Sequence, residues 1–307
     1  MNKLQWESLP PGRMAAIEEL TGSVVKAESA RGGLMPGLAA VIHTGNGKYF
    51  VKAAPADSPA ARLYEREMAV NTALPANIPA PRIRHSSRED GWLVMVFDFL
   101  DARDADLSPG SPDLDGVVSA LTTIGAARAW DAAPPASTNV TALQDKAAAL
   151  LGKQPGGQPW DMYRDATDSF DTSVLAGDRL VHYDLHAGNL KVAADAAVLA
   201  VDWAFACAGA PWIDAALLVP RLIEAGHTPA AAERLASRLP AWRAAPGPAV
   251  TALAALWTMF REYKAIYGPE GARAFREQAA RAGRSWVEYR MLLLGFEIGG
   301  AVSRRVY

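Results

Sequence analysis

The spacing of apolar residues changes near residue 100, and this change constrains the fold more than any other feature of the sequence. Before it, short β-prone runs alternate with turns; Asn46-Gly47 stands between two of them and is a strong hairpin signal. A helical stretch begins with Ser58-Pro59, a capping residue followed by a first-turn proline. The predicted elements are a helix at 11–20, strands at 23–29, 38–44 and 48–54, a helix at 58–74 and a strand at 92–97.

Beyond this point the sequence is predominantly helical in pattern. Residues 101–115 contain Pro, Gly and Asp and are typical of a linker, which predicts a small β-rich domain at 1–100 and a larger, mainly helical domain at 101–307. The predicted fold class is therefore α+β. Helices are predicted at 114–131, 140–151, 160–175, 214–225, 229–243, 249–267, 271–282 and 285–305.

The composition excludes several classes of protein. With 307 residues, 50% hydrophobic and 21% charged, the chain is an ordinary globular protein, and its net charge of −2 does not favour a nucleic-acid partner. We see neither a secretory leader nor an apolar segment long enough for a membrane, so a cytoplasmic protein without membrane contact is expected. The single cysteine, Cys207, excludes an internal disulfide, and no obligate protein partner is evident.

A polar loop between apolar runs carries the clearest chemical signal. It reads His-Tyr-Asp-Leu-His-Ala-Gly-Asn at 182–189, and Asp202 follows the next apolar run. Phosphoryl transfer needs a carboxylate to accept the proton of the attacking hydroxyl, which suits Asp184, and oxygen ligands for Mg²⁺, which suit Asn189 and Asp202. A surface loop of ordinary turn formers is the alternative, but it does not explain this spacing.

The same spacing resembles the catalytic loop of protein kinases, and the residues around it resemble the aminoglycoside phosphotransferase family of small-molecule kinases. Two departures stand out: Tyr183 occupies the position where that family usually has Gly, and no Arg precedes Asp184. The resemblance implies a bilobal protein-kinase-like fold, with a small β-rich N-lobe containing one main helix and a larger helical C-lobe. It also implies ATP or GTP as phosphoryl donor, with Mg²⁺.

The resemblance assigns further residues to the nucleotide. Lys52 is expected to contact the phosphates, and Glu67 is expected to pair with it, with Glu65 as the rival. Gly32 and Gly33 are expected to cover the phosphates, although a flexible hairpin turn explains them equally well.

Three more positions have expected roles. The backbone around Phe97 and Phe99 is expected to bind the purine edge, and His186 to lie near the γ-phosphate. His182 is expected to be a buried structural imidazole, and Asp214 either caps a helix or clamps the catalytic loop.

The acceptor is less constrained by the sequence. The resemblance implies an alcohol group on a small antibiotic, either an aminoglycoside or another hydroxylated antibiotic such as a nucleoside or peptide, with resistance as the outcome. An acidic patch on one helix would suit a polycation, although a solvated helix face explains it as well; its members are Asp161, Asp165, Asp168 and Asp171, with Glu262 nearby. The alternatives are a metabolic kinase of the choline, sugar or homoserine type and a catalytically silent pseudokinase.

Overall fold

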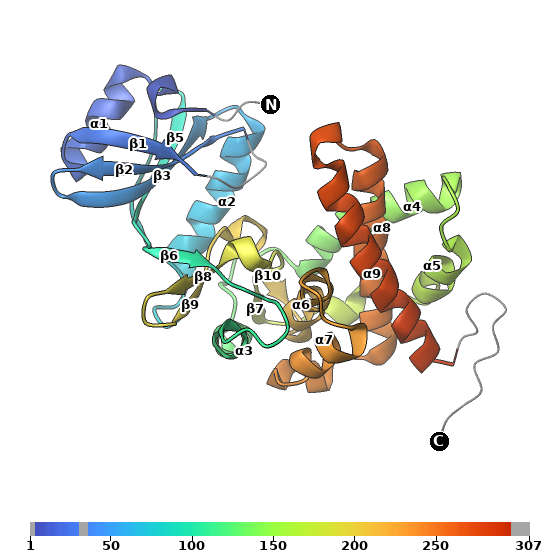
Figure 1. The fold of residues 1–307 in the computed structure, drawn as a ribbon. Helices are drawn as coiled ribbons and strands as arrows, with labels where there is room; N and C mark the ends of the chain where they lie inside the picture. The colour runs from blue at the N-terminus through green and yellow to red at the C-terminus, as the bar shows by residue number, and fades with distance from the viewer. Residues whose placement is uncertain (1–3, 31–35, 296–307) are drawn as a thin grey trace. The chain divides into compact units, whose positions relative to one another are not determined.

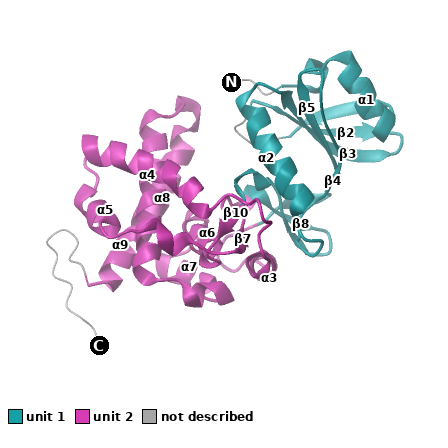
Figure 2. Ribbon diagram, turned by 180° about the vertical axis from the view of Figure 1, so that it is seen from behind, with its two compact units in different colours: residues 1–105, 188–206 teal, residues 106–187, 207–307 magenta. Residues whose placement is uncertain are grey.

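The computed structural model describes residues 4–30 and 36–295. These residues form two compact units, shown in teal and magenta in Figure 2: unit 1 is 1–105 with 188–206, and unit 2 is 106–187 with 207–307. Residues 188–206, which the sequence-based division assigns to the C-terminal domain, therefore belong to the first unit by their contacts. The predicted domain boundary near residue 100 stays a prediction.

Unit 1 is built on a five-stranded antiparallel sheet in the order β1-β2-β3-β5-β4 (Figure 1). The predicted hairpin is confirmed, with Thr44 opposite Gly47 at its turn, where Gly47 has a φ of +132° that favours glycine. The strand β4 was not predicted, because Ile83 is its only strongly apolar residue and most of its residues are exposed. The strands are β1 (Val24–Ser29), β2 (Leu38–Thr44), β3 (Gly47–Pro55), β4 (Ile83–Glu89) and β5 (Trp92–Asp98).

Both faces of this sheet are covered, which explains why β3 and β5 are almost continuously apolar. Alternate residues of a strand point to opposite faces. On one face Val51, Val94 and Val96 pack in a core with Ile17 of α1 (Pro11–Thr21). On the other face the apolar side chains of β3 and β5 pack against α2 (Pro59–Ala73). Any polar side chain that β3 turns toward α2 is therefore held in a buried environment.

A second, three-stranded sheet of unit 1 has the order β6-β8-β9, and β6 occupies three residues of the segment 101–115 that the sequence predicts to be a linker. Ala102 pairs with Ala193, so the segment gains its extended conformation from a strand ninety residues later rather than from its own sequence. The elements are β6 (Ala102–Asp104), β8 (Leu190–Ala193), β9 (Val198–Ala200), and the 3-10 turns η1 (Trp6–Ser8), η3 (Ala187–Asn189) and η4 (Trp203–Phe205).

Unit 2 is mainly helical, with one two-stranded ladder formed by β7 (Arg179–Val181) and β10 (Cys207–Gly209). Among the described residues no helix has both the length and the apolar character needed to cross a bilayer. The helices and turns of unit 2 are α3 (Asp113–Ala126), α4 (Ala136–Lys153), α5 (Trp160–Thr167), η2 (Thr172–Leu175), α6 (Trp212–Glu224), α7 (Pro229–Ala236), η5 (Pro240–Ala244), α8 (Gly247–Tyr267), η6 (Glu270–Ala272) and α9 (Arg273–Leu293).

Two predicted helices are shorter than expected. The helix predicted at 160–175 ends at Thr167, and the Asp171 side chain accepts the Ser173 N–H at 2.9 Å to start a separate 3-10 turn. The helix predicted at 229–243 ends at Ala236, because Pro240 lacks the N–H that would continue it and instead opens η5.

The two helices predicted at the C-terminal end are one helix, α9, up to Leu293. Its interior Gly283 lies against α8, and a Cβ there would come within 2.3 Å of Thr258 Oγ1. Close packing therefore explains a glycine that looked like a break between helices. Residues 296–305 of the second predicted helix lie outside the described residues.

The confirmed part of the fold prediction is its class. A β-rich N-terminal part carrying one main helix, α2, is followed by a mainly helical C-terminal part, as expected for an α+β protein.

Candidate active site

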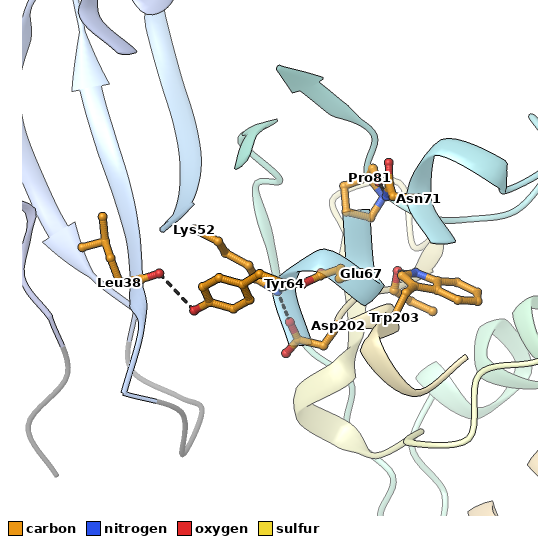
Figure 3. A network of polar contacts seen from close by, with 9 residues as sticks. Leu38, Lys52, Tyr64, Glu67, Asn71, Pro81, Asp202 and Trp203 are labelled. Atoms are coloured by element: carbon orange, nitrogen blue, oxygen red, sulfur yellow. Dashed lines mark hydrogen bonds and ion pairs between the residues drawn. The ribbon is translucent and has the colours of Figure 1, made fainter. Parts of the chain in front are cut away.

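Lys52 is the buried centre of a polar cluster in unit 1. It lies on β3 opposite Met95 of β5, on the sheet face that α2 covers, and is 7% exposed. Its ammonium lies 2.8 and 2.7 Å from the two carboxylate oxygens of Glu67 and also contacts Oδ1 of Asp202 (Figure 3). One cation is thus held between two carboxylates.

The helix α2 decides which glutamate reaches Lys52. Ser58 caps it by accepting the Ala61 N–H at 3.2 Å, and Pro59 occupies its first turn. Glu67 then falls on the buried face, whereas Glu65 points elsewhere and pairs with Arg88 on β4. The geometry therefore brings Glu67, and not its rival, to the lysine.

Two aromatic rings complete the surroundings of the ammonium. The Lys52 Nζ lies 5.7 Å from the centroid of Tyr64 and 6.0 Å from that of Phe97. Tyr64 donates its hydroxyl to the Leu38 carbonyl at 3.1 Å, and burial raises its pKa to about 12. The sequence reasoning missed Tyr64; the available signal was an aromatic residue three positions before Glu67, on the same helix face.

Burial and neighbouring charges shift the pKa values of Lys52 and Glu67 in opposite directions. Burial alone lowers the pKa of Lys52, but Glu67 and Asp202 outweigh it and hold that pKa above its usual range. Burial raises the pKa of Glu67, and Lys52 opposes the change. The lysine therefore stays charged in a largely dry environment, where its attraction for an anion is strong.

Asn189 and Asp202 are brought together by the ladder between β8 and β9. Leu190 pairs with Ala200, and the Val201 N–H donates to the Asn189 carbonyl at 2.9 Å, so Asn189 and Asp202 stand at neighbouring positions at one end of the ladder. Asn189 is 4% exposed, whereas the Asp202 side chain is 52% exposed. The Trp203 indole donates to the Ala200 carbonyl at 2.9 Å and anchors the turn that carries Asp202 (Figure 3).

The donor set of these two residues suits Mg²⁺. An amide oxygen and a carboxylate are hard ligands, and Mg²⁺ commonly takes only one or two protein ligands beside water and phosphate oxygens. Within the described ranges there is no cluster of three or more His, Cys, Asp or Glu side chains that would form an all-protein metal cage. A cation shared with a bound phosphate therefore fits better than a structural metal.

In unit 2 the polar loop that begins at His182 follows β7, and Asp214 holds its first two residues. The Asp214 carboxylate accepts the His182 N–H at 2.7 Å and the Tyr183 N–H at 2.8 Å, so the clamp, and not the cap, is its observed role. Burial raises the pKa of Asp214 to about 6, while these two hydrogen bonds oppose the change. His182 is fully buried, as expected, and Asp184 and His186 are partly exposed.

Tyr183 occupies a backbone conformation that favours glycine. Its φ is +72°, which is unusual for a bulky residue and accounts for the Gly that the resembling family has here. Its hydroxyl is buried and has no hydrogen-bond partner among the described residues, and burial raises its pKa. A buried hydroxyl without a hydrogen-bond partner lowers the stability of the folded state. Tyr183 therefore has two unfavourable features, a strained backbone and an unpaired hydroxyl.

Phe97 lies near the end of β5, and Phe99 follows that strand. Phe97 is 4% exposed, and the Lys48 ammonium lies 5.2 Å from the ring centroid of Phe99. Gly32 and Gly33 lie outside the described residues.

The expected acidic patch does not form on one helix. Asp161 is exposed and pairs with Arg164, Asp168 follows the last residue of α5 as its C-cap, and Asp171 caps the next turn. Glu262 is buried and pairs with Arg284 at 2.5 Å.

The chain matches a known protein family in sequence and known protein structures in fold. Residues 39–286 match the model of a phosphotransferase enzyme family. No curated protein matches the chain in sequence.

Solved structures resemble the chain along almost its whole length. An aminoglycoside phosphotransferase from Alicyclobacillus acidocaldarius has a TM-score of 0.64 at 15% identity, covering 94% of this chain and 97% of its own. A choline kinase, LicA from Streptococcus pneumoniae, has a TM-score of 0.61 at 18% identity, covering 89% and 99%. A thermostable mutant of the aminoglycoside phosphotransferase APH(4)-Ia, in a ternary complex with ADP and hygromycin B, has a TM-score of 0.57 at 15% identity, covering 89% and 98%. These TM-scores show a shared fold, and at such low sequence identity they show the fold alone.

Proposed function

Because the chain belongs to the phosphotransferase enzyme family, we propose that it transfers the γ-phosphoryl group of ATP or GTP to a hydroxyl group of a small molecule. Membership confirms two predictions made from the sequence, the family resemblance and the phosphotransferase class, and the neighbouring structures confirm the protein-kinase-like fold.

The observation that carries the donor side of the proposal is Lys52 between Glu67 and Asp202. Glu67 fixes a charged lysine at one place on a rigid sheet, where it suits the α- and β-phosphates. A bound triphosphate would attract the ammonium away from Asp202. Asp202 would then be released to act with Asn189 on Mg²⁺, which supplies charge neutralisation for the phosphate oxygens.

Asp184 is proposed as the base that accepts the proton of the attacking hydroxyl. The Asp214 clamp fixes the two peptide N–H groups just before it, which limits the orientations open to its carboxylate. Phosphoryl transfer depends largely on the positioning of the reacting groups. The hydrogen bonds of Asp214 therefore support a role of Asp184 as the base.

Other donor contacts remain proposals. The backbone around Phe97 and Phe99 would bind the purine edge. Gly32 and Gly33 would cover the phosphates, and His186 would donate to the γ-phosphate. Phe97 supports this arrangement, because it lies 6.0 Å from the Lys52 ammonium.

The acceptor class is proposed only as a hydroxylated small molecule. The structural neighbours include an aminoglycoside phosphotransferase complexed with hygromycin B and a choline kinase, so antibiotic modification and metabolic phosphorylation are both represented at low identity. Antibiotic resistance stays a prediction.

The test is direct. The purified protein is incubated with γ-labelled ATP or GTP and Mg²⁺, and label transfer is measured to a panel of antibiotics, amino alcohols, sugars and hydroxy acids. In parallel, expression in a sensitive bacterium is scored for resistance. Transfer to at least one hydroxyl compound is expected. Nucleotide binding without transfer to any compound would support the pseudokinase alternative and refute the proposal.

A further inference from the structure

The helix α8 of unit 2 leaves three aromatic rings on one side partly uncovered. Phe260 and Tyr263 are half-buried and Tyr267 is exposed, and the ring centroids of the two tyrosines lie 4.8 Å apart. Residues three or four positions apart share one side of a helix, so the three rings belong together. Glu262, on another side of α8, is buried and pairs with Arg284 of α9. The rings therefore form part of the surface of the unit.

Two of these rings have a lysine of the neighbouring helix beside them. Nζ of Lys146 lies 5.0 Å from the ring centroid of Tyr263, and Nζ of Lys153 lies 5.3 Å from that of Tyr267. Both lysines belong to α4, which packs beside α8 (Figure 1). The two helices thus place ammonium groups along the same aromatic surface.

Three more cations border this side of α8. Nζ of Lys264 lies 5.4 Å from the ring centroid of Phe260, and the Lys264 carbonyl accepts a hydrogen bond from the Arg276 guanidinium of α9 at 3.2 Å. The half-buried Arg261 has its guanidinium carbon 5.7 Å from the Phe260 ring centroid. We call the surface around the three rings the cationic face; its cations are Lys146, Lys153, Arg261, Lys264 and Arg276.

In the part of the chain that the structure describes, no carboxylate forms an ion pair with any of these five cations. The buried carboxylate of α8, Glu262, is already paired with Arg284. Asp145 and Glu277 adjoin two of the cations in sequence, but adjacent residues of a helix face different directions. Because the whole chain has a net charge of −2, the excess of positive charge on this face is local.

Positive charges gathered in this way are unfavourable to one another. Burial lowers the pKa of Lys264, and the charges of Arg276, Lys146 and Arg261 lower it further. Contacts between cations and aromatic rings offset little of this repulsion at an exposed surface. A surface lined by one sign of charge concentrates counter-ions of the other sign. The cationic face is therefore suited to an anion.

The spacing of the lysines indicates how many anionic groups the ligand carries. Lys146 and Lys153 are seven residues apart, which is about 10 Å along α4, and each lies beside its own ring. A ligand that contacts both lysines in these positions needs more than one anionic group.

We propose that the cationic face binds a small molecule with two or more phosphate or carboxylate groups, with Lys146, Lys153 and Lys264 as its main contacts. The proposed donor residues Lys52, Asn189 and Asp202 belong to unit 1, whereas the cationic face belongs to unit 2. The binding site therefore goes beyond the proposed phosphotransfer and does not depend on it.

The experiment compares anions of different charge on the full-length protein. Inorganic triphosphate, citrate and inorganic phosphate are titrated by calorimetry in a Mg²⁺-free buffer of low ionic strength. The test variant combines Lys146→Gln with Lys153→Gln. The control variant combines Arg234→Gln with Arg243→Gln, which removes the same charge from exposed positions of α7 and η5.

We expect triphosphate or citrate to bind the wild type about tenfold or more tightly than phosphate does. The test variant should lose about tenfold or more of this affinity, and the control variant should stay close to the wild type. Equal affinity of the wild type and the test variant would assign the bound anion to another site, such as the donor site, and overturn the proposal. Absence of binding, equal binding of phosphate, or an equal loss in the control variant would also overturn it.

Thermal unfolding separates binding from a purely structural role of the two lysines. Triphosphate should raise the unfolding midpoint of the wild type and of the control variant more than that of the test variant. A lower midpoint of the test variant without anions, with no effect of triphosphate on the wild type, would show that the lysines only stabilise the helices.

A short single-stranded oligonucleotide is the last probe, because rings interleaved with cations also suit nucleic acid. It should bind no more tightly than triphosphate does. Much tighter binding of the oligonucleotide would overturn the assignment to a small molecule.

Discussion

Lys52 and Glu67, on a strand and a helix of the same unit, form a buried ion pair with the ammonium 2.7 Å from the carboxylate. The sheet and α2 are both covered by apolar packing at this point, so the pair is held by rigid elements rather than by the flexible side chains alone.

Glu67→Gln should therefore raise the KM for the nucleotide and lower kcat, because the lysine loses its fixed orientation. Removing one partner of a buried pair also typically costs about 3–5 kcal/mol of stability, although Asp202 can still neutralise Lys52 and reduce that cost. Steady-state kinetics and urea unfolding check both effects. Glu65→Gln, which removes the surface pair with Arg88, is the matched control and should change neither. Equal behaviour of the two variants would contradict the assignment.

Asp184→Asn should retain the fold and nucleotide binding but lower turnover by about 10²- to 10⁴-fold, as expected for loss of a positioned base. The nucleotide Kd and kcat are measured on the same preparation. Asp165→Asn, at an exposed position of α5, is the control and should leave kcat unchanged. Near-normal turnover by the Asp184 variant would remove Asp184 from the mechanism.

The pKa of Asp214 predicts a pH dependence of stability. Its pKa in the folded protein is about 6, against an ordinary value of 3.8, so between these values the folded chain holds a proton that the unfolded chain has released. The contribution of Asp214 to the free energy of unfolding is therefore greatest below pH 4. It falls by about 3 kcal/mol in total as the pH rises through 6.

Urea unfolding of the wild type and Asp214→Asn at several pH values checks this prediction. The free energy of unfolding of the wild type, relative to the variant, should fall between pH 4 and pH 7. A constant difference across that range would show that Asp214 does not titrate there.

Substitution of Asn71 is expected to lower the stability of unit 1 without a role in the proposed chemistry. Its side chain donates to the Pro81 carbonyl at 2.8 Å and accepts the Ile83 N–H at 2.9 Å, which ties α2 to the start of β4. Asn71→Ala should lower the free energy of unfolding by about 1–3 kcal/mol, because two backbone groups lose their partner. Thr72→Ala removes only an exposed bond to the Met68 carbonyl and should be nearly neutral. A similar loss in both variants would be inconsistent with this explanation.

The local sequence determined those features that depend on neighbouring residues. The Asn46-Gly47 turn, the Ser58-Pro59 helix start and the loop containing Asp184 and Asn189 each carry their own chemical signal, so the α+β class and the phosphotransferase family could be predicted. For segments without such signals, the sequence-based predictions were wrong or missing. The strand β6 forms because its residues pair with β8. The helix α9 continues through Gly283 because α8 packs closely against that residue.

The tertiary structure alone decided which side chains meet. Choosing Glu67 over Glu65 required the orientation of α2 on the sheet, and the hydrogen bonds of Asp214 to the His182 and Tyr183 N–H groups required α6 to pack near a loop about thirty residues earlier. These contacts depend on the burial of whole faces of helices and sheets, which sums over many distant residues. A local pattern specifies an element and its chemistry, whereas burial specifies the neighbours of each side chain and thereby its charge state.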